Sequence, residues 1–338
     1  MGCVKLVSFM LYPFFGQLAF SSSLPHLCPE DQALALLQFK HMFTINPNAS
    51  DYCLNISTGQ EIQSYPRTLL WNKSTDCCSW DGIHCDEMTG QVIELDLCCS
   101  QLQGKFHSNS SLFQLSNLKR LDLSYNDFTG SLISPKFGEF SNLMHLDLSC
   151  SSFTDTQLRG VLPERVFHLS DLESLDLSEN PQLTVRFPTT KWNSSASLMK
   201  LYLYDVNITG RIPESFGHLT SLHELYMGYT NLSGPIPKPL WNLTHIESLF
   251  LDDNHLEGPI SQFSRFEKLK KLTLKNNNFD DRLEFLSFNR SWVQLEWLIL
   301  SSNSIHHEWT AKPKKAILVI KLLEWDYLYL PGYFPFLH

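Results

Sequence analysis

The sequence predicts an α/β repeat fold: a right-handed solenoid of short parallel strands, with an N-terminal cap stabilised by disulfides. Three observations predict it. One leucine motif recurs nine times across residues 91–310. Its copies begin 23 to 29 residues apart, a period typical of solenoids. Residues 24–90 lack the motif but contain five of the nine cysteines, which predicts a separate cap.

The motif has the form Leu-x-x-Leu-x-Leu-x-x-Asn-x-Leu, which is the pattern of leucine-rich repeats. Its copies begin at Val92, Leu118, Leu143, Leu172, Leu198, Leu222, Ile246, Leu269 and Leu295. Successive side chains of a strand point to opposite faces, so the leucines should face the interior and the residues between them the outside. Neighbouring strands are expected to stack in parallel about 4.8 Å apart as one curved sheet.

The asparagine of the motif is expected to turn the chain inward and to bond free backbone groups of the next coil. Asn126, Asn180, Asn254, Asn277 and Asn303 fill this position, whereas Ser100, Ser151, Val206 and Thr230 depart from it. The Val206 side chain cannot donate a hydrogen bond, so we expect the asparagine ladder to be weakest there.

A solenoid needs a cap because the leucines of its first coil would otherwise face water. The segment CPEDQALALLQFKHMF, from Cys28, predicts an amphipathic helix with Leu34, Leu37 and Phe39 on or near one face. Trp71 and Trp80 supply large apolar area further along the cap.

Residues 1–23 have the parts of a secretory signal peptide: one lysine, an apolar run over residues 6–20, and small residues. The run is short and interrupted by Pro13, Gly16 and Gln17, so we do not expect a membrane span. Nine N-x-S/T triplets predict glycosylation of a secreted chain. They begin at Asn48, Asn55, Asn72, Asn109, Asn193, Asn207, Asn231, Asn242 and Asn289.

In an oxidising compartment the eight cysteines after the leader are candidates for disulfides. Adjacent cysteines rarely bridge to one another, so Cys77 and Cys78 should have different partners. Cys53 is expected to pair with Cys98 or Cys99 of the first repeat, and the choice stays open. Cys150 should be an exposed thiol near the concave rim. The histidine spacing does not fit zinc, so no metal site is predicted.

The second half of several repeats contains a G-x-I-P-like step, as in ITGRIPESFGHLTSL and LSGPIPKPLWNLTHI. This subtype resembles the plant extracellular leucine-rich repeats, in which the step begins a second short strand followed by a 3₁₀-like turn. Residues 28–90 resemble the plant N-terminal cap of such proteins. The resemblance implies that Cys77 pairs with Cys28 and that Cys78 pairs with Cys85.

Longer stretches, among them NPNASDYC and SYPRTLLWNKSTDCCSWDGIHCDEMTGQVIELDL, resemble the tomato Cf-type disease-resistance receptor-like proteins, from about residue 24 to residue 304. The resemblance implies a plasma-membrane receptor with an extracellular repeat domain, one membrane span and no kinase of its own. Its partners would be a pathogen-derived or host protein or peptide ligand and a receptor-kinase co-receptor. Here the atypical C-terminal tail, residues 311–338, departs from the family, and we read it as a truncation without a transmembrane helix.

The position between the second and third leucines should face a partner on the concave sheet. It reads Asp96, Asp122, Asp147, Asp176, Tyr202, Tyr226, Phe250, Thr273 and Ile299. We expect the aspartates to form a solvated stripe and the aromatic run to mark a protein interface. The predicted ligand-binding residues are Tyr202, Tyr204, Tyr226, Tyr229, Phe250, Asp252, Lys271 and Lys275. The alternative is ring stacking that only stiffens the sheet.

Other classes of function are disfavoured. The net charge is −9 and no Lys/Arg-rich block occurs, which argues against nucleic acid as a partner. The His306-His307-Glu308 run lacks the spacing of a zinc protease, so we predict no enzyme, no catalytic residue and no cofactor. Two alternatives remain: a secreted apoplastic inhibitor similar to the plant polygalacturonase-inhibiting proteins, and a non-functional product. The absence of a cysteine after Cys150 counts against the inhibitor.

Overall fold

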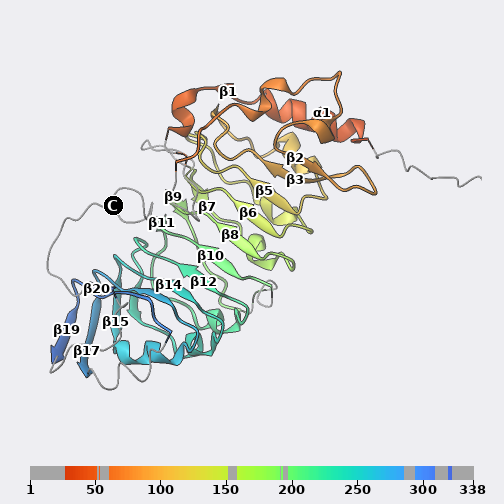
Figure 1. The fold of residues 1–338 in the computed structure, drawn as a ribbon. Coiled ribbons are helices and arrows are strands. Elements are labelled where there is room, and N and C mark those ends of the chain that lie inside the picture. The colour runs from red at the N-terminus through yellow and green to blue at the C-terminus, as the bar shows by residue number, and fades with distance from the viewer. Residues whose placement is uncertain are drawn as a thin grey trace, which may run out of the picture.

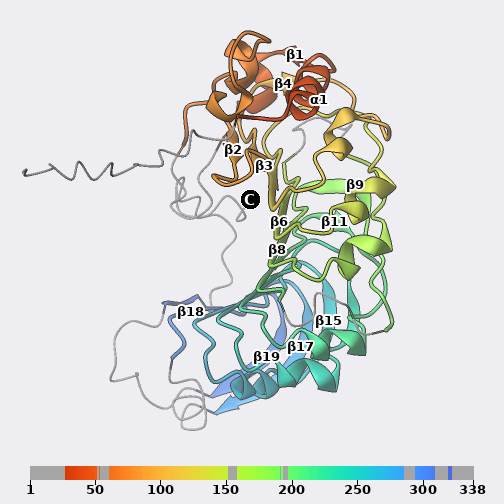
Figure 2. The same cartoon turned by 90° about the vertical axis from the view of Figure 1, so that its right-hand side faces the viewer.

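The computed structural model describes residues 27–51, 53, 61–150, 158–190, 192, 197–284, 294–308 and 319–321. These residues form a curved solenoid whose inner side is lined by the main sheet and whose outer side carries short helices (Figures 1 and 2). This is the leucine-rich-repeat solenoid that the sequence predicts. The predicted signal peptide and nearly all of the predicted C-terminal tail lie outside the described residues.

The main sheet has 11 strands among the described residues. In sheet order they are β2 (Ile83–Cys85), β3 (Val92–Asp96), β5 (Arg120–Asp122), β6 (His145–Asp147), β8 (Ser174–Asp176), β10 (Lys200–Tyr202), β12 (Glu224–Tyr226), β14 (Ser248–Phe250), β16 (Lys271–Thr273), β18 (Trp297–Ile299) and β20 (Val319–Lys321). β2 pairs antiparallel with β3, and the later pairs are parallel. The register places the central leucine of each repeat beside that of the next, as Leu201 lies beside Leu225.

A left-handed residue lies three positions after the end of nine of these strands, from β3 to β18, and turns the chain away from the sheet. Tyr125, Tyr229 and Asn276 occupy equivalent positions and have φ of 54°, 55° and 54°. A non-glycine residue in this region costs roughly 1–2 kcal/mol, so the stacked coils must impose it. The sequence pattern gave no sign of this turn, because the residues there share no chemistry.

Outer strands follow the turn in most repeats. One group contains β7 (Gly160–Val161), β9 (Asn180–Thr184) and β11 (Val206–Asn207), and another contains β13 (Ser233–Pro235), β15 (His255–Gly258), β17 (Asn278–Glu284) and β19 (Ser304–Glu308). Short 3₁₀ helices complete the coils: η4 (Ser111–Gln114), η5 (Pro135–Glu139), η6 (Glu164–His168), η8 (Glu214–His218), η9 (Lys238–Asn242) and η10 (Ile260–Arg265). β13 is thus followed by η9 and β15 by η10, as expected for plant-type repeats.

The cap contains the helix α1 (Glu30–Lys40), the 3₁₀ helices η1 (Pro47–Ser50), η2 (Arg67–Leu70) and η3 (Cys77–Ser79), and strand β1 (Thr44–Ile45), which pairs with β4 (Leu102–Gln103). The predicted apolar face of α1 needs one correction: Leu34 is 45% exposed. The face turned to the first repeat contains Gln32, Ala35, Leu36 and Phe39, spaced as one side of a helix. The Gln32 side chain accepts a hydrogen bond from the Val92 amide at 2.8 Å, which ties α1 to β3.

Aromatic rings connect the cap to the repeats inside the solenoid. Phe106 lies 6.0 Å from Phe39 of α1, measured between ring centroids, and 5.6 Å from Phe137 of η5. Phe113 and Phe128 also contact Phe106. The cap and the first repeats therefore share one apolar core.

The asparagine ladder forms as predicted. Asn126 is fully buried, and its amide nitrogen donates to the carbonyls of Leu97, Leu123 and Ser124 at 2.7–3.1 Å. Its carbonyl oxygen accepts from the Leu102 amide at 2.9 Å. Val206 is 1% exposed at the equivalent position, and β11 changes register against β9 there. The side chain of Val206 fills the space of the asparagine but contributes no hydrogen bond to the ladder.

Replacing Asn126 by leucine should lower the free energy of unfolding by about 2–4 kcal/mol. The change leaves several buried backbone groups without a partner, each at a cost of roughly 1–3 kcal/mol before relaxation. Denaturant unfolding followed by far-UV circular dichroism measures it. Asn278→Leu, at an exposed position of β17, is the control, and an equal effect there would contradict the ladder's role.

Candidate ligand-binding face

Three aromatic side chains form a continuous row across the concave sheet. Tyr202, Tyr226 and Phe250 lie at matching register positions of β10, β12 and β14. The ring centroids of Tyr202 and Tyr226 are 4.6 Å apart, and those of Tyr226 and Phe250 are 4.3 Å apart. Both tyrosine hydroxyls donate to the Glu224 carboxylate. The predicted aromatic run therefore forms one continuous row, in which Tyr202 is 9% exposed and Tyr226 and Phe250 are half-buried.

A second aromatic pair lies beside this row, at the end of the strands. The rings of Tyr204 and Tyr229 are 5.1 Å apart. Tyr204 is 8% exposed and Tyr229 is 36% exposed, so the pair has a buried and an open member. Burial and the neighbouring carboxylates raise the pKa of both hydroxyls, which stay protonated and able to donate.

The charged residues predicted for this face lie on the next two repeats. Asp252 follows β14 and is 4% exposed. Burial raises its pKa to about 7, while Lys275 opposes the shift. Lys271 begins β16 and lies beside Ser248 in the register. The face is thus aromatic at its centre, with acidic and basic groups towards the C-terminal repeats.

The aspartates of the N-terminal repeats do not form the solvated stripe that the sequence suggested. Asp122 and Asp176 are 6% and 4% exposed. The Asp176 carboxylate accepts from the backbone amide of Ser178, two residues on, and Asp147 does the same with Ser149. The short side chain folds back on its own strand; the neighbouring strands cover Asp122 and Asp176, whereas Asp96 and Asp147 are half-buried. Burial, followed by the charges of Asp122 and Asp176, raises the pKa of Asp147 well above its usual range.

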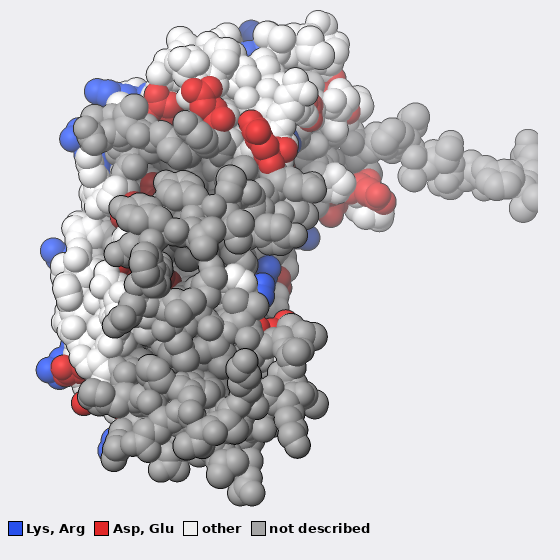
Figure 3. Space-filling view, turned by 60° about the vertical axis from the view of Figure 1, so that its left-hand side comes forward, with Lys and Arg blue, Asp and Glu red and all other residues white. Residues whose placement is uncertain are grey.

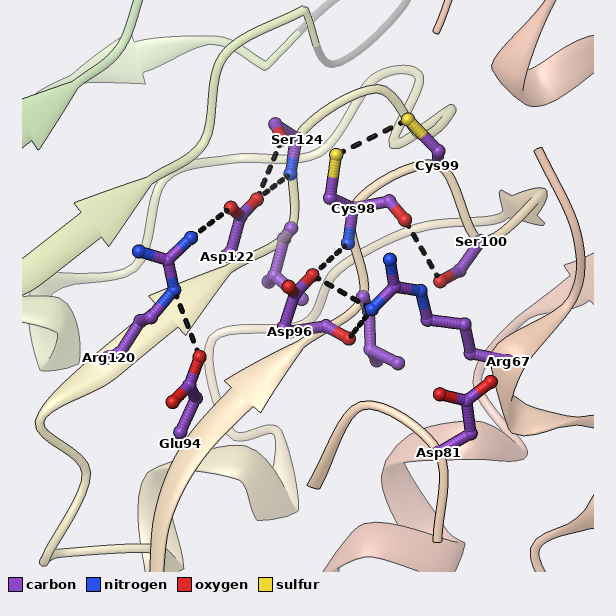
Figure 4. Close-up of polar contacts among 12 residues, drawn as sticks. Arg67, Asp81, Glu94, Asp96, Cys98, Cys99, Ser100, Arg120, Asp122 and Ser124 are labelled. Carbon is purple, nitrogen blue, oxygen red and sulfur yellow. Dashed lines mark hydrogen bonds and ion pairs between the residues drawn. The ribbon is translucent and has the colours of Figure 1, made fainter. Parts of the chain in front are cut away.

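An ion-pair network joins the cap to the start of this sheet (Figure 4). Arg67 of η2 lies 3.3 Å from a carboxylate oxygen of Asp96 and donates to its carbonyl. Arg120 bridges Glu94 and Asp122, both at 3.1 Å. Figure 3 shows acidic side chains gathered towards the cap end of the visible face. Sequence reasoning missed Arg67, because the cap lacks the repeat that would have placed it.

The cap contains the disulfides Cys28–Cys77 and Cys78–Cys85, the pairing that the family resemblance implies. Cys53 bonds Cys99, which resolves the choice that the sequence left open. Cys150 is 4% exposed, so the expectation of an exposed thiol is wrong: its side chain packs in a cluster with Tyr125 and Cys99.

Two groups of cysteines and acids have the spacing of metal ligands among the described residues, Cys28, Asp76, Cys77 and Cys78, and Cys53, Cys98 and Cys99. All of these cysteines except Cys98 are in disulfides, so they cannot bind metal as thiolates.

The predicted glycosylation sites differ in accessibility. Asn48, Asn72, Asn109, Asn231 and Asn242 are exposed, and Asn207 is half-buried with its amide donating to Thr184. Asn55, Asn193 and Asn289 lie outside the described residues. Within the described part of the chain, no helix has the length and apolar character needed to span a membrane.

Family models match three parts of the chain. A model described as leucine rich repeat matches residues 196–256, and a second such model matches residues 117–138. The leucine rich repeat N-terminal domain matches residues 29–53 and 61–86. Together with the fold, these matches define a leucine-rich-repeat protein with its own N-terminal cap.

The relatives narrow this class. Receptor-like protein Cf-9 of Solanum pimpinellifolium is 67% identical over 345 residues, covering 82% of this chain and 40% of the relative. Receptor-like protein 9DC1 of the same species is 65% identical over 359 residues, covering 86% and 42%. The chain belongs to the Cf-type leucine-rich-repeat receptor-like proteins. It spans less than half the length of these relatives.

Among solved structures, the ectodomain of the Arabidopsis receptor kinase HAESA, in complex with an extended IDA peptide hormone, is similar with a TM-score of 0.63 and 28% identity. The match covers 81% of this chain and 41% of that one. The ectodomain of GASSHO1/SCHENGEN3 from Arabidopsis thaliana, in complex with CASPARIAN STRIP INTEGRITY FACTOR 2, matches with a TM-score of 0.55 and 25% identity over 80% of this chain and 32% of that one.

Proposed function

We propose that this chain is the extracellular recognition part of a plant immune receptor-like protein, and that it binds a protein or peptide ligand on its concave sheet. The observation that carries the proposal is the surface formed by Tyr202, Tyr226, Phe250, Tyr204 and Tyr229, with rings 4.3–5.1 Å apart on neighbouring repeats. Clustered tyrosines supply large contact area at low entropic cost and dominate many interfaces.

Two further parts of the proposal rest on family membership. The chain would be secreted and glycosylated, and it would signal only through a partner kinase. The exposed sites at Asn48, Asn72 and Asn109 are compatible with glycans, because bulky sugars need free space. The peptide in the HAESA complex gives a ligand class for that protein, and we extend it to this one.

Selection of random short peptides displayed on phage, against the purified secreted chain, tests the proposal. We expect enriched peptides that bind the Tyr226→Ala/Phe250→Ala double variant at least about tenfold more weakly, the usual loss at an aromatic hot spot. His145→Ala, on the same face but three strands from β12, is the matched control.

Equal binding to the double variant would place the ligand elsewhere, and absence of enriched peptides would remove the proposal. The melting temperature of the double variant distinguishes this proposal from the alternative that the rings only stiffen the sheet. Under that alternative the melting temperature falls while peptide binding stays unchanged.

A further inference from the structure

Two adjacent leucines of the cap project into solvent. Leu69 is 63% exposed, and Leu70 is 80% exposed, more than any other large apolar side chain among the described residues. Single exposed apolar residues are ordinary on a protein surface, but an adjacent pair concentrates apolar area at one place. We call Leu69 and Leu70 the leucine patch.

Buried residues on both sides hold the leucine patch outward. Thr68, before it, is 1% exposed, and Trp71, after it, is 3% exposed with its ring stacked 5.2 Å from that of Trp80. Lys40 of α1 donates to the Leu69 carbonyl at 3.3 Å and to the Trp71 carbonyl at 3.0 Å. A rotation of η2 that buried the leucines would break these contacts, so the chain cannot cover the patch by turning it inward.

A glycosylation triplet begins two residues after the leucine patch. Asn72 is exposed, and its side-chain nitrogen, the atom to which a glycan is attached, donates to the Leu70 carbonyl at 2.9 Å. Its side-chain oxygen accepts from the Ser74 amide at 3.0 Å and from the Ser74 hydroxyl. This Asx turn fixes the direction of the Asn72 side chain. The attachment atom is therefore held against the backbone of the patch.

Attachment of a glycan is compatible with this geometry. The anomeric carbon of the first sugar, an N-acetylglucosamine, bonds to Asn72 Nδ2; the nitrogen loses one proton, and the pyrophosphate of the lipid-linked sugar donor leaves. One N–H remains on Nδ2 to donate to the Leu70 carbonyl. The sugar then starts beside Leu70, and its C–H groups and acetyl methyl group are apolar surfaces that leucine side chains can contact.

We propose that the glycan on Asn72 covers the leucine patch; this inference rests on the secretion and glycosylation that the proposed function includes. The apolar sides of the first sugars pack on Leu69 and Leu70 while their hydroxyls face water, which removes apolar area from solvent. The exposed site at Asn109 offers no such surface, because its exposed neighbours His107 and Ser108 are polar.

Two substitutions at Ser74 test this inference on the purified secreted chain. Ser74→Ala removes the triplet but leaves the bonds of Asn72 to the Leu70 carbonyl and to the backbone amide of residue 74. Ser74→Thr keeps the triplet and is the matched control. Mass spectrometry of the glycopeptide measures the occupancy of Asn72, and fluorescence of the dye ANS measures exposed apolar surface.

We expect Asn72 to carry a glycan in the parent and in Ser74→Thr. Ser74→Ala should bind more ANS, and its melting temperature should be lower by about 2–4 °C. Adding the double substitution Leu69→Ser/Leu70→Ser to Ser74→Ala should return the ANS fluorescence to the parent level. Asn109→Gln, which removes a glycan from a site with polar neighbours, should leave the ANS fluorescence unchanged.

The outcomes separate this inference from the proposed function. An unmodified Asn72 in a chain that carries glycans elsewhere, or unchanged ANS fluorescence in Ser74→Ala, overturns the inference alone. A chain without a glycan at any site also removes glycosylation from the proposed function, whereas peptide binding to the concave sheet tests the rest of that function independently. If Leu69→Ser/Leu70→Ser lowers the ANS fluorescence of the glycosylated parent, the leucine patch is open despite the glycan, which also overturns the inference.

Discussion

Replacing Phe106 by alanine is expected to lower the free energy of unfolding by about 3–5 kcal/mol, the usual cost of truncating a buried phenylalanine. Phe106 is 6% exposed and contacts rings on both sides of the cap boundary. Its loss leaves a cavity between α1 and the second repeat, where the coils cannot collapse because disulfides hold the cap. In a solenoid each coil contacts only its neighbours, so the damage should be local.

Hydrogen exchange resolves where the stability is lost. Amides of α1 and of η4 should exchange faster in Phe106→Ala, while those of β14 and β16 should be unchanged. Phe106→Leu, which keeps most of the volume, should cost less than half as much. A uniform increase in exchange along the solenoid would mean that the coils unfold as one unit and that the local account is wrong.

The sequence periodicity predicted most of the fold because the repeated leucines are the residues that pack inside each coil. Leu95, Leu201 and Leu298 are buried at matching positions, and the space at such a position accepts few side chains other than leucine. The cap was less predictable because it is not repeated. Leu34 was placed on the buried face from the apolar pattern of the helix, whereas the buried face begins at Gln32, whose side-chain oxygen accepts from the Val92 amide of β3.

The candidate site was predictable where it follows the register and not where it depends on burial. The motif places Tyr202, Tyr226 and Phe250 on neighbouring strands, and they stack there. The motif says nothing of the left-handed turn at Tyr229, whose ring lies beside that of Tyr204. It also cannot tell a solvated aspartate from one covered by the next strand, which is why the aspartate stripe was misjudged.

Those buried aspartates predict an unusual pH dependence. Burial raises the pKa of Asp176 to about 7, and it raises the pKa of Asp122 and Asp147 as well. In the unfolded chain these carboxylates ionise near their ordinary pKa of about 4, so between pH 4 and 7 the folded chain binds more protons. The contribution of these groups to stability should therefore be complete below about pH 4 and be lost as the pH rises to about 7.

The neutral variant Asp147→Asn isolates this effect. The amide oxygen can still accept from the Ser149 backbone amide, but the charge between Asp122 and Asp176 is gone. We expect the variant to be more stable than the parent at pH 7, where the parent carries the cost of the raised pKa, and equal to it near pH 4. Burial lowers the pKa of His145 on the same strand, which opposes the trend but acts in both proteins.

The difference between the two denaturant curves at each pH is therefore the quantity to measure, with Asp171→Asn at an exposed position as the control. If Asp147→Asn is the less stable protein at pH 7, the charged aspartate is a net stabiliser. The row of aspartates would then stabilise the folded state of the first repeats. It would not be a destabilising feature that burial of the leucine core compensates.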